Sequence, residues 1–434
     1  MKNTENLALK NVIFPKNEFM SAFCELLKIR SVKTDPQPSA PFGEGVKKAL
    51  LYTLSLAESF GFKTVNYDNY IGEIVFGEGK GNPFGILCHL DVVPEGDLSD
   101  WNTNPYEPAV IDGKLYARGA LDDKCGPMSF LFAMKALKNA GVVPEREIRL
   151  ILGCDEESGW GCIRHYESVA SLPEEGISPD ADFPVIYAEK GIAHIVYKFK
   201  KSPALKWIRG GTAANVVCDK VEFEVENSGL YGDYHEFIKN GKVITSLGIA
   251  AHGSTPEKGK NALEPVLKFL SENKLVEKNA YENLFEDAFH LKTLNDETGY
   301  LTFSPDLIRS DDDNIYVTVD CRYPSTLKHE FVAEKLALLG EYEVKNWQEP
   351  LFSDKNGGLV KTLLDIYNEI TGLHAEPVAI GGGTYARALK RGVAFGPANG
   401  EEADSIHKPN EYITLKTIDD MNAIYLETLK RICF

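Results

Sequence analysis

The sequence predicts an α/β protein in which a main domain, with a mostly parallel sheet flanked by helices, is interrupted by an inserted α+β domain. Three observations predict this class. Helix-like and strand-like patterns alternate over residues 1–190, longer alternating runs dominate residues 191–348, and the first pattern returns over residues 349–434. We take these ranges as the first part of the main domain, the inserted domain and the second part of the main domain.

The first part of the main domain contains a strand–helix–strand unit. Apolar residues recur at helical spacing over 18–29 and 46–60, and Gly61 ends the second of these helices. Strand patterns follow at 72–76, 84–93 and 146–154. A helix over 127–140, ended by Gly141, separates the last two strands, which is the order of a βαβ unit. Open sheets of this kind hold their ligands at the carboxyl ends of the strands.

The inserted domain has a different pattern, with longer strand-like runs in which residue character alternates. Such runs lie at 193–200, 220–227 and 314–324. One helix is expected over 261–274, where Asn261 can cap its start. A helix over 359–372 and a glycine cluster at 381–383 then resume the pattern of the main domain.

Composition and charge narrow the class of partner. The 434 residues carry a formal net charge of −17 without a dense Lys or Arg run, which argues against nucleic acid and membrane surfaces. The N-terminus lacks the apolar core of a signal peptide, and no apolar run approaches the roughly 20 residues of a membrane span. The eight scattered cysteines favour free thiols in a reducing compartment. We expect a cytoplasmic monomer or homodimer.

Candidate metal ligands follow two of the strands in the main domain. His89 and Asp91 close the run at 84–93, and because they are two residues apart in a strand their side chains share a face. The carboxylate can then hold the imidazole tautomer while the other ring nitrogen takes a metal ion. After the strand at 146–154 come three adjacent carboxylates, Asp155, Glu156 and Glu157.

Neighbouring residues in an extended chain cannot face the same point, so Glu156 and Glu157 are expected to divide the work. One would ligate, and the other would take a proton from metal-bound water. In the segment LDDK we favour Asp122 as a carboxylate that bridges two ions, with Asp123 turned outward and paired with Lys124.

The remaining ligands come from two later segments. Asp180 or Asp182 can supply one more carboxylate, and spacing alone does not choose between them. His407, near the C-terminus, can supply the second imidazole. Because His407 must then join His89, the intervening domain is expected to be an insertion.

Two residues of the inserted domain, together with the glycine cluster, are candidates for binding a substrate. His252 is flanked by small residues that allow close approach of a ligand. Arg322 can offer a two-pronged donor to a substrate carboxylate. The cluster Gly381 to Thr384 lacks the spacing of a phosphate-binding loop, so close approach of its backbone to a peptide explains it better.

Taken together, these segments resemble the co-catalytic zinc peptidases of the aminoacylase and carnosinase type, and within them the bacterial dipeptidases. The matching segments run from about residue 85 to 415 and include HLDVVPEGD, ARGALDDK, DEESGWGC, PDADFP, AAHGSTPEKGKNA, DCRYP, GGGTYARA and SIHKPNE. The resemblance implies a catalytic domain interrupted by a lid domain. One departure is Cys125, where relatives usually have Gly; the thiol would crowd the helix start or stand near the metals.

The resemblance also implies a role for each residue. The expected metal ligands are His89, Asp122, Glu157, Asp180 and His407. Glu156 would be the general base, and Asp91 would orient His89. The residues that would hold the substrate and the developing oxyanion, or line the pocket, are Asn215, His252, Arg322, Gly382, Gly383, Thr384 and Arg387.

We therefore expect a metal-dependent dipeptidase that hydrolyses the peptide bond of unblocked dipeptides with a metal-activated water. An aminoacylase or N-deacylase on the same scaffold is the first alternative, and a metal-binding protein without turnover is the second. Two divalent ions are expected. Zinc is the first choice, and manganese or cobalt would also suit carboxylate and imidazole ligands.

Overall fold

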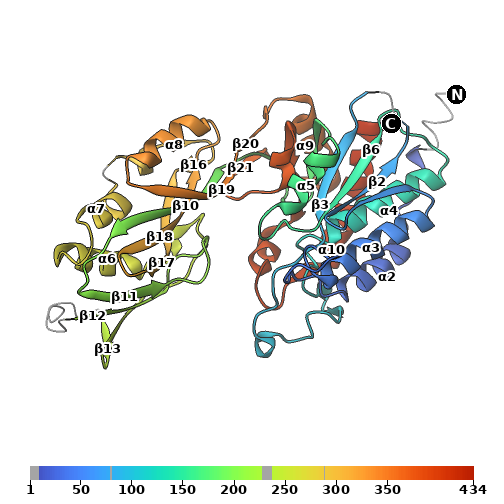
Figure 1. Cartoon of the computed structure of the whole chain (residues 1–434). Coiled ribbons are helices and arrows are strands. Elements are labelled where there is room, and N and C mark those ends of the chain that lie inside the picture. Colours follow the sequence, from blue (N-terminus) through green and yellow to red (C-terminus); the bar gives the residue numbers. More distant parts are fainter. Residues whose placement is uncertain (1–8, 79–80, 227–236, 288) are drawn as a thin grey trace. The chain divides into compact units, whose positions relative to one another are not determined.

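The computed structural model describes residues 9–78, 81–226, 237–287 and 289–434. The chain separates into two compact units (Figure 1). The first unit comprises Met1–Tyr187, Ser353–Val378 and Thr384–Phe434, and the second comprises Ala188–Phe352 and Ala379–Gly383. The domain boundaries that we expected from the sequence, at 190/191 and 348/349, stay a prediction.

The first unit is built on a sheet whose centre is parallel. The strand order is β1-β2-β6-β3-β7-β22, followed by β9. The parallel pairs are β6 with β3, β3 with β7 and β7 with β22. The strands are β1 Lys63–Tyr67, β2 Ile71–Phe76, β3 Phe84–His89, β6 Ile148–Gly153, β7 Glu175–Ser178, β9 Ile186–Glu189 and β22 Arg391–Ala394.

The edges of this sheet are antiparallel, so the expectation of a mostly parallel sheet holds for its centre only. Strands β1 and β2 form a hairpin, and β2 runs antiparallel to β6. The hairpin turn contains Asp68 and Asn69, both with positive φ, which matches the right-handed twist of two paired strands. At the other edge β22 and β9 are also antiparallel.

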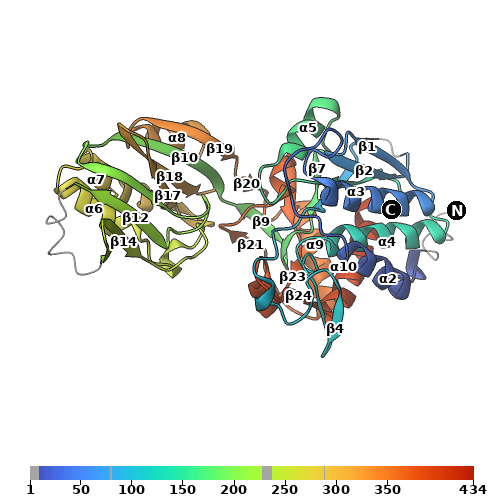
Figure 2. The same cartoon turned by 60° about the horizontal axis from the view of Figure 1, so that its bottom comes forward.

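Helices cover both faces of the sheet. On β2, Gly72 faces α3 (Glu44–Ser59), while the neighbouring Glu73 accepts a hydrogen bond from Tyr166 of α5 (Gly161–Val169), so these helices lie on opposite faces. Helices α2, α4, α9 and α10 pack in succession, α2 on α4, α4 on α10 and α10 on α9 (Figure 2). Their bounds are α2 Lys16–Leu27, α4 Cys125–Asn139, α9 Gly358–Thr371 and α10 Leu415–Cys433.

The strand–helix–strand unit predicted from the sequence is confirmed. Helix α4 connects β3 to β6, which are parallel neighbours, and α4 is apolar on nearly every side because it is buried between the sheet and other helices. Strand β3 is buried along its whole length and ends at His89. The fold therefore delivers His89 to the carboxyl edge of the parallel strands.

A small sheet brings the C-terminal segment beside the segment before Asp122. Its strands are β24 (Tyr412–Thr414), β5 (Lys114–Tyr116) and β4 (Ala109–Ile111), in that order. The β4–β5 turn is Asp112-Gly113, with φ of 50° and 75°, a pair suited to a tight hairpin. The remaining short strand pair in this unit is β8 (Ala181–Asp182) with β23 (Pro397–Ala398).

The second unit is an antiparallel sheet covered by helices. The strand order is β13-β14-β12-β11-β17-β18-β10-β19. The strands are β10 Gly191–Lys200, β11 Leu205–Gly210, β12 Lys220–Val225, β13 Ile238–Asn240, β14 Val243–Leu247, β17 Thr302–Ser310, β18 Asn314–Tyr323 and β19 Tyr342–Gln348. The strand expected over 220–227 is thus β12, and Asn227 lies outside the described residues.

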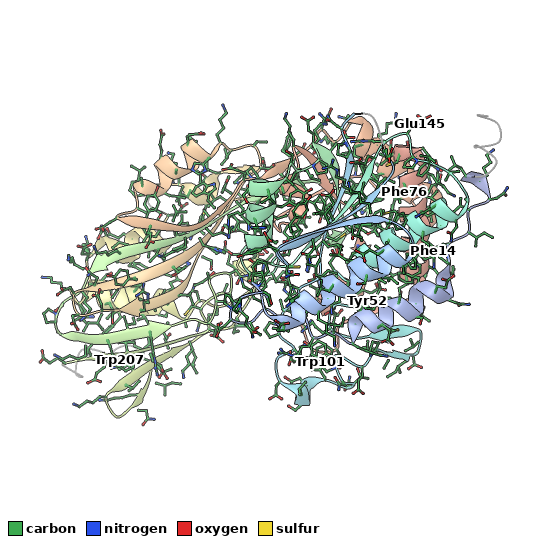
Figure 3. The ribbon with its side chains drawn as sticks, turned by 45° about the vertical axis from the view of Figure 1, so that its right-hand side comes forward. Phe14, Tyr52, Phe76, Trp101, Glu145 and Trp207 are labelled. Carbon is green, nitrogen blue, oxygen red and sulfur yellow. The ribbon has the colours of Figure 1, made fainter. Side chains whose placement is uncertain are left out.

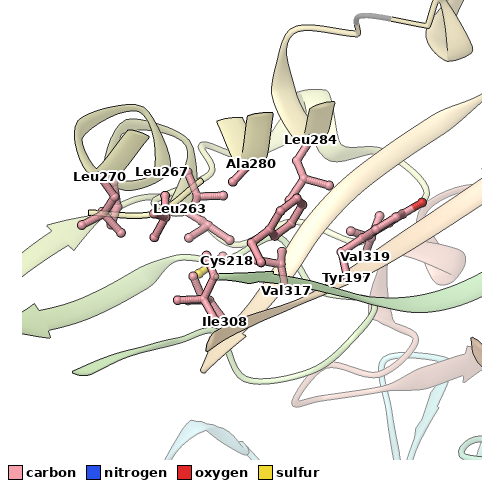
Figure 4. Close-up of a cluster of buried hydrophobic side chains, with 14 of the residues drawn as sticks. Tyr197, Cys218, Leu263, Leu267, Leu270, Ala280, Leu284, Ile308, Val317 and Val319 are labelled. Carbon is pink, nitrogen blue, oxygen red and sulfur yellow. The ribbon is translucent and has the colours of Figure 1, made fainter. Parts of the chain in front are cut away.

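Helices α6 (Leu263–Glu272), α7 (Asn279–Phe285) and α8 (His329–Ala337) share one core with this sheet. Figure 4 shows side chains of α6 and α7 packed against β17 and β18. Asn261 caps the start of α6 as expected, since its Oδ1 accepts from Leu263 N–H at 2.9 Å. Along β18 the core side chains alternate with a second set, Tyr316, Thr318, Asp320 and Arg322, which lies on the other face.

The structure also bears on two expectations about environment. All eight cysteines lie among the described residues, and each is a free thiol. In the same described part of the chain, no helix is both long enough and apolar enough to span a membrane.

Candidate metal centre

Three neighbouring parallel strands end at the candidate metal centre. His89 is the last residue of β3, and it lies opposite Gly153, the last residue of β6. Glu156 and Glu157 follow β6 after a short loop, and Asp180 follows β7, which pairs with β3 on its other side. Because β6, β3 and β7 point the same way, the residues that follow them meet at one edge of the sheet.

The two imidazoles face the two oxygens of one carboxylate. His89 Nε2 lies 3.0 Å from Asp122 Oδ1, and His407 Nε2 lies 2.9 Å from Asp122 Oδ2. His407 Nε2 also lies 3.1 Å from Glu157 Oε2, and His89 Nε2 lies 3.6 Å from Asp180 Oδ2. One oxygen of Asp122 thus faces His89, and the other faces His407, as the oxygens of a bridging carboxylate would. The peptide bond between Asp122 and the next residue is cis.

The protonation of His89 Nδ1 follows from its second contact. His89 Nδ1 lies 2.9 Å from the backbone oxygen of Asp91, which can only accept, so Nδ1 carries a proton and Nε2 is the nitrogen that faces the carboxylates of Asp122 and Asp180. The carboxylate of Asp91 is farther away, at 3.6 Å. Asp91 thus contacts His89 most closely through its main chain, and not through the carboxylate that we expected to orient the ring.

The Asp91 carboxylate instead holds the segment that carries the two glutamates. Its Oδ1 accepts from Glu156 N–H at 3.1 Å, and its Oδ2 accepts from Glu157 N–H at 3.2 Å. Asp91 is buried, with 1% of its surface exposed. Asp91 therefore links the ring of His89, at the end of β3, to the backbone that follows β6.

Two overlapping groups of side chains have ligand atoms close enough to hold a metal ion. His89, Asp122 and Glu157 form one group, and His89, Glu156 and Asp180 form the other, with the ligand atoms of each group within 4.8 Å of one another. Glu157 Oε1 is buried without a hydrogen-bond partner in the described structure. A divalent ion with oxygen and imidazole ligands fits this donor set, and it would satisfy that oxygen.

Electrostatics also favour a cation at this place. Burial raises the pKa of Glu156 well above its usual range, and nearby Asp180 raises it further. Burial likewise raises the pKa of Asp180 to about 7. Burial lowers the pKa of His407, but Glu157 and Asp122 outweigh this and raise it to about 11. So many carboxylates in a buried place stabilise positive charge among them.

The adjacent glutamates belong to different groups of ligand atoms. Glu157 lies beside His407 and Asp122, whereas Glu156 belongs to the group with Asp180 and accepts from Trp160 Nε1 at 3.3 Å. This agrees with the expectation that neighbouring residues face different points. The structure favours Asp180 over Asp182 as a candidate ligand, because Asp180 faces His89 while Asp182 is exposed on β8.

One expectation about the segment LDDK is wrong. Asp123 is fully buried and points inward, and its Oδ2 accepts from His89 N–H at 3.1 Å. Lys124 is not its partner. The Lys124 Nζ donates to the backbone oxygens of Leu26 and Ile29, at 3.3 and 2.7 Å, so the lysine anchors the chain after α2.

Cys125 does not crowd the helix start. It is the first residue of α4, and its thiol is 3.2 Å from the backbone oxygen of Leu121, where it can donate a hydrogen bond. Burial raises the pKa of this thiol well above its usual range, which disfavours the thiolate that a metal would need. Among the described residues neither group of potential ligands contains a cysteine.

Asp155 has a structural role that sequence reasoning missed. Its Oδ1 accepts from Lys33 Nζ at 2.6 Å and from Ser158 Oγ at 2.7 Å, and its Oδ2 accepts from Gly161 N–H at 2.8 Å. Asp155 therefore shapes the loop between β6 and α5. In the sequence Asp155 is the first of three adjacent carboxylates, and adjacency alone does not indicate which of the three accepts hydrogen bonds from the loop.

The predicted substrate residues of the second unit form a local network. His252 pairs with Val216 in an isolated β-bridge, and Gly253 N–H donates to Asn215 O at 2.7 Å. Asn215 and His252 thus lie on adjacent segments. His252 is exposed, and its Nδ1 lies 2.7 Å from Ser254 Oγ.

Arg322 is held in place within this network. Its Nε donates to Asp320 Oδ2 at 3.2 Å, and its Nη1 donates to Gly381 O at 3.0 Å. Asp320 was missed from the sequence, although it lies two residues before Arg322 on the same face of β18. A Cβ at Gly253 would come within 2.2 Å of Asp320 Oδ2, so any larger residue would have to displace this carboxylate.

The glycine cluster divides between the units. Gly382 and Gly383 belong to the second unit, and Thr384 and Arg387 to the first. Thr384 Oγ1 accepts from Ala386 N–H at 3.2 Å and so caps the short helix η4 (Tyr385–Ala388) that contains Arg387. The role of these four residues in lining a substrate pocket stays a prediction.

A parallel sheet that presents carboxylates and imidazoles at its carboxyl edge, where open sheets hold their ligands, suits a metal-dependent hydrolase. The chain belongs to peptidase family M20/M25/M40, whose family model matches residues 85–431. It is a metallopeptidase by family, which confirms the resemblance, the fold class and the enzyme class expected from the sequence.

Individual relatives agree over nearly the whole chain. A Bacillus subtilis protein named "Putative dipeptidase YtjP" is 33% identical, with 96% of this chain and 98% of the relative covered. A "Putative dipeptidase" of Staphylococcus epidermidis is 34% identical, with 98% and 99% covered.

Solved structures show the same fold. An M20 family metallo-carboxypeptidase from Sulfolobus solfataricus has a TM-score of 0.62 at 17% identity, covering 95% of this chain and 98% of that one. Human carnosine dipeptidase 1 has a TM-score of 0.60 at 14% identity, covering 98% and 99%.

The second unit yields a prediction about pH. Asp306 on β17 is fully buried, with Ser304 Oγ donating to its Oδ1 at 2.5 Å, and burial raises its pKa to about 8. An unfolded Asp titrates near 4. Between these values the folded state binds more protons than the unfolded chain, so the free energy of unfolding falls as pH rises, by up to about 1.4 kcal/mol per unit.

Asp306→Asn should therefore flatten this fall, because Asn resembles the protonated acid. The measurement is urea unfolding at several pH values between about 4 and 8, with chelator present throughout. Asp312→Asn, at an exposed turn between β17 and β18, is the matched control and should keep the wild-type slope. Equal slopes in all three proteins would contradict the prediction.

Proposed function

We propose that this protein is a metal-dependent dipeptidase that hydrolyses the peptide bond of unblocked dipeptides. The observation that carries the proposal is the Asp122 carboxylate, whose two oxygens face His89 and His407 separately. Family membership and dipeptidase-named relatives over the whole chain support the same reaction. The substrate is a small peptide.

We propose two divalent ions, with Asp122 bridging. His89 and Asp180 would hold one ion, and His407 and Glu157 the other. Zinc is our first choice, and manganese or cobalt would suit the same oxygen and nitrogen ligands. Bound there, such ions would polarise the scissile carbonyl and lower the pKa of water.

The remaining chemistry falls to Glu156. We propose that its carboxylate removes a proton from the attacking water and delivers it to the nitrogen of the leaving amino acid. Two observations support this role: its group with His89 and Asp180, and a pKa raised by burial, which makes the carboxylate a stronger base. Asp91 supports Glu156 by holding its backbone N–H.

The second unit, in this proposal, supplies the grip on the substrate. We assign residues 191–348 to a lid domain and residues 1–190 and 349–434 to the catalytic domain. His252 would donate to the developing oxyanion, and Arg322 would bind the substrate carboxylate, with Asn215 beside them. The pocket would be lined by Gly382, Gly383, Thr384 and Arg387.

The setting of the enzyme is proposed from composition. The net charge of −17 supports action on small peptides without nucleic-acid or membrane partners. Eight free thiols support a cytoplasmic location. The working form would be a monomer or a homodimer.

A substrate panel tests the reaction itself. Apo-protein supplied with zinc, manganese or cobalt should cleave free dipeptides, and acetylation of the dipeptide amino group should abolish cleavage. N-acyl amino acids turned over in preference to free dipeptides would make the protein an aminoacylase. Metal binding without turnover of any substrate would make it a metal-binding protein only.

The adjacent glutamates should separate by mutation. Glu156→Gln should keep metal affinity and lower turnover by roughly 10² to 10⁴, the usual worth of a positioned acid or base. Glu157→Gln should weaken metal binding instead, because it removes charge from a ligand. Metal content and steady-state kinetics of both variants are measured together, and equal metal loss in the two would refute the assignment.

The lid residues should separate by kinetic parameter. His252→Ala should lower kcat by about 10² to 10³, since a donor to the oxyanion acts mainly in the transition state. Arg322→Ala should raise KM more than His252→Ala does, because it also removes a grip on the bound substrate. Metal content should stay at the wild-type level in both, and a near-normal kcat for His252→Ala would remove that residue from the mechanism.

A further inference from the structure

A single buried carboxylate, Glu411, collects the donors of the segment that leads to Asp122. Its Oε2 accepts from Arg118 Nη1 at 2.7 Å and from Gly119 N–H at 3.1 Å. Its Oε1 accepts from Leu121 N–H at 2.9 Å and from Asp122 N–H at 3.2 Å. Glu411 has no exposed surface, so all four contacts are sheltered from water.

These contacts act on the backbone of a candidate ligand. The side chain of Asp122 extends from the very residue whose N–H Glu411 holds, so its carboxylate projects from a fixed point of the backbone. The main chain adds a further link, because Ala117 N–H donates to Glu411 O at 3.2 Å. Strand pairing of β24 with β5 continues from that point.

Glu411 also belongs to the segment that carries the second imidazole. His407 lies four residues earlier, with a positive φ of 63°, in a turn where Lys408 N–H donates to Ser405 O. Asn410 fixes the far end of this turn, since its side chain bonds to the backbone of Asn102 and Asp100 at 2.7 and 2.8 Å. Glu411 thus lies in the same short segment as His407, while its carboxylate holds the backbone of Asp122.

Arg118 completes the arrangement by balancing the buried charge. Its side chain is 1% exposed and lies over the ring of Trp101, which is labelled in Figure 3, at 5.2 Å from the ring centre. Arg118 Nη2 also donates to Pro94 O at 3.4 Å. A buried carboxylate with this many donors is held far more rigidly than one in water.

We propose that Glu411 is a positioning residue of the metal centre, which fixes Asp122 and His407, from distant parts of the sequence, in the arrangement that two ions require. The proposal rests on the proposed metal-dependent function. It concerns metal affinity directly and peptide cleavage only through it. Residues behind the ligands typically change metal affinity or activity by about 10 to 100-fold when removed.

Glu411→Gln tests this, because the variant keeps size while replacing one acceptor oxygen with an NH₂ group that faces N–H donors. The affinity of the apo-protein for Zn²⁺ should fall by about 10 to 100-fold in competition with a chelator. The visible spectrum of the Co²⁺-loaded protein should also change, because the ligand geometry around the ion changes. Wild-type affinity together with a wild-type spectrum would overturn the proposal.

The matched control is Glu402→Gln in the same C-terminal segment. Glu402 is a buried carboxylate too, but its Oε1 accepts from Thr417 Oγ1 at 2.7 Å and Thr414 N–H at 3.3 Å, at the start of α10. It should lower thermal stability while leaving Zn²⁺ affinity and the Co²⁺ spectrum unchanged. Loss of Zn²⁺ affinity in both variants would reduce Glu411 to a general structural role.

A milder variant covers the case in which Glu411→Gln does not fold. Arg118→Lys keeps the positive charge but cannot reproduce the geometry of the guanidinium, so it should weaken Zn²⁺ binding by a smaller factor. A folded Arg118→Lys with wild-type affinity would then overturn the proposal. Failure of the dipeptidase function is recognised separately, as a wild-type protein that binds Zn²⁺ and cleaves no dipeptide.

Discussion

Two imidazoles contact the two oxygens of one carboxylate in this protein, and much of the surrounding structure positions these three side chains. Asp122 places one oxygen 3.0 Å from His89 and the other 2.9 Å from His407. Glu156, Glu157 and Asp180 lie close to this contact, and burial raises the pKa of each of them. These carboxylates therefore keep their negative charge most readily when a cation lies among them, which favours a metal centre at this place.

The candidate ligands are held through the main chain as much as through side chains. Asp91 accepts the N–H groups of Glu156 and Glu157, and Glu411 accepts those of Leu121 and Asp122. In each case a buried carboxylate fixes the backbone from which a candidate ligand projects. Because that backbone is already ordered, less conformational entropy would be lost when an ion binds.

Much of this centre could be predicted because local rules determine it. Period-two alternation places His89 and Asp91 on one face, and the ends of parallel strands collect the acidic segments. The orientation of Asp123 could not be predicted, because it depends on two contacts between distant segments. Asp123 accepts a hydrogen bond from His89 N–H at the end of β3, and Lys124, its expected partner, donates to the backbone oxygen of Ile29 instead. Glu411 was missed for a similar reason, since its donors are distant in sequence. The antiparallel edges of the sheet were not predicted, because a buried hairpin strand and a buried parallel strand have similar hydrophobic patterns.

Because the chain is synthesised from its N-terminus, the candidate metal centre can be completed only late in translation. The second unit is formed mainly by one continuous stretch, Ala188–Phe352, whereas the first unit lacks β22, β24 and α10 until the C-terminal part has been made. At about 5 to 20 residues per second, on the order of half a minute separates translation of His89 from that of His407. A nascent chain therefore lacks His407, one of the five candidate ligands, until its own synthesis is almost complete.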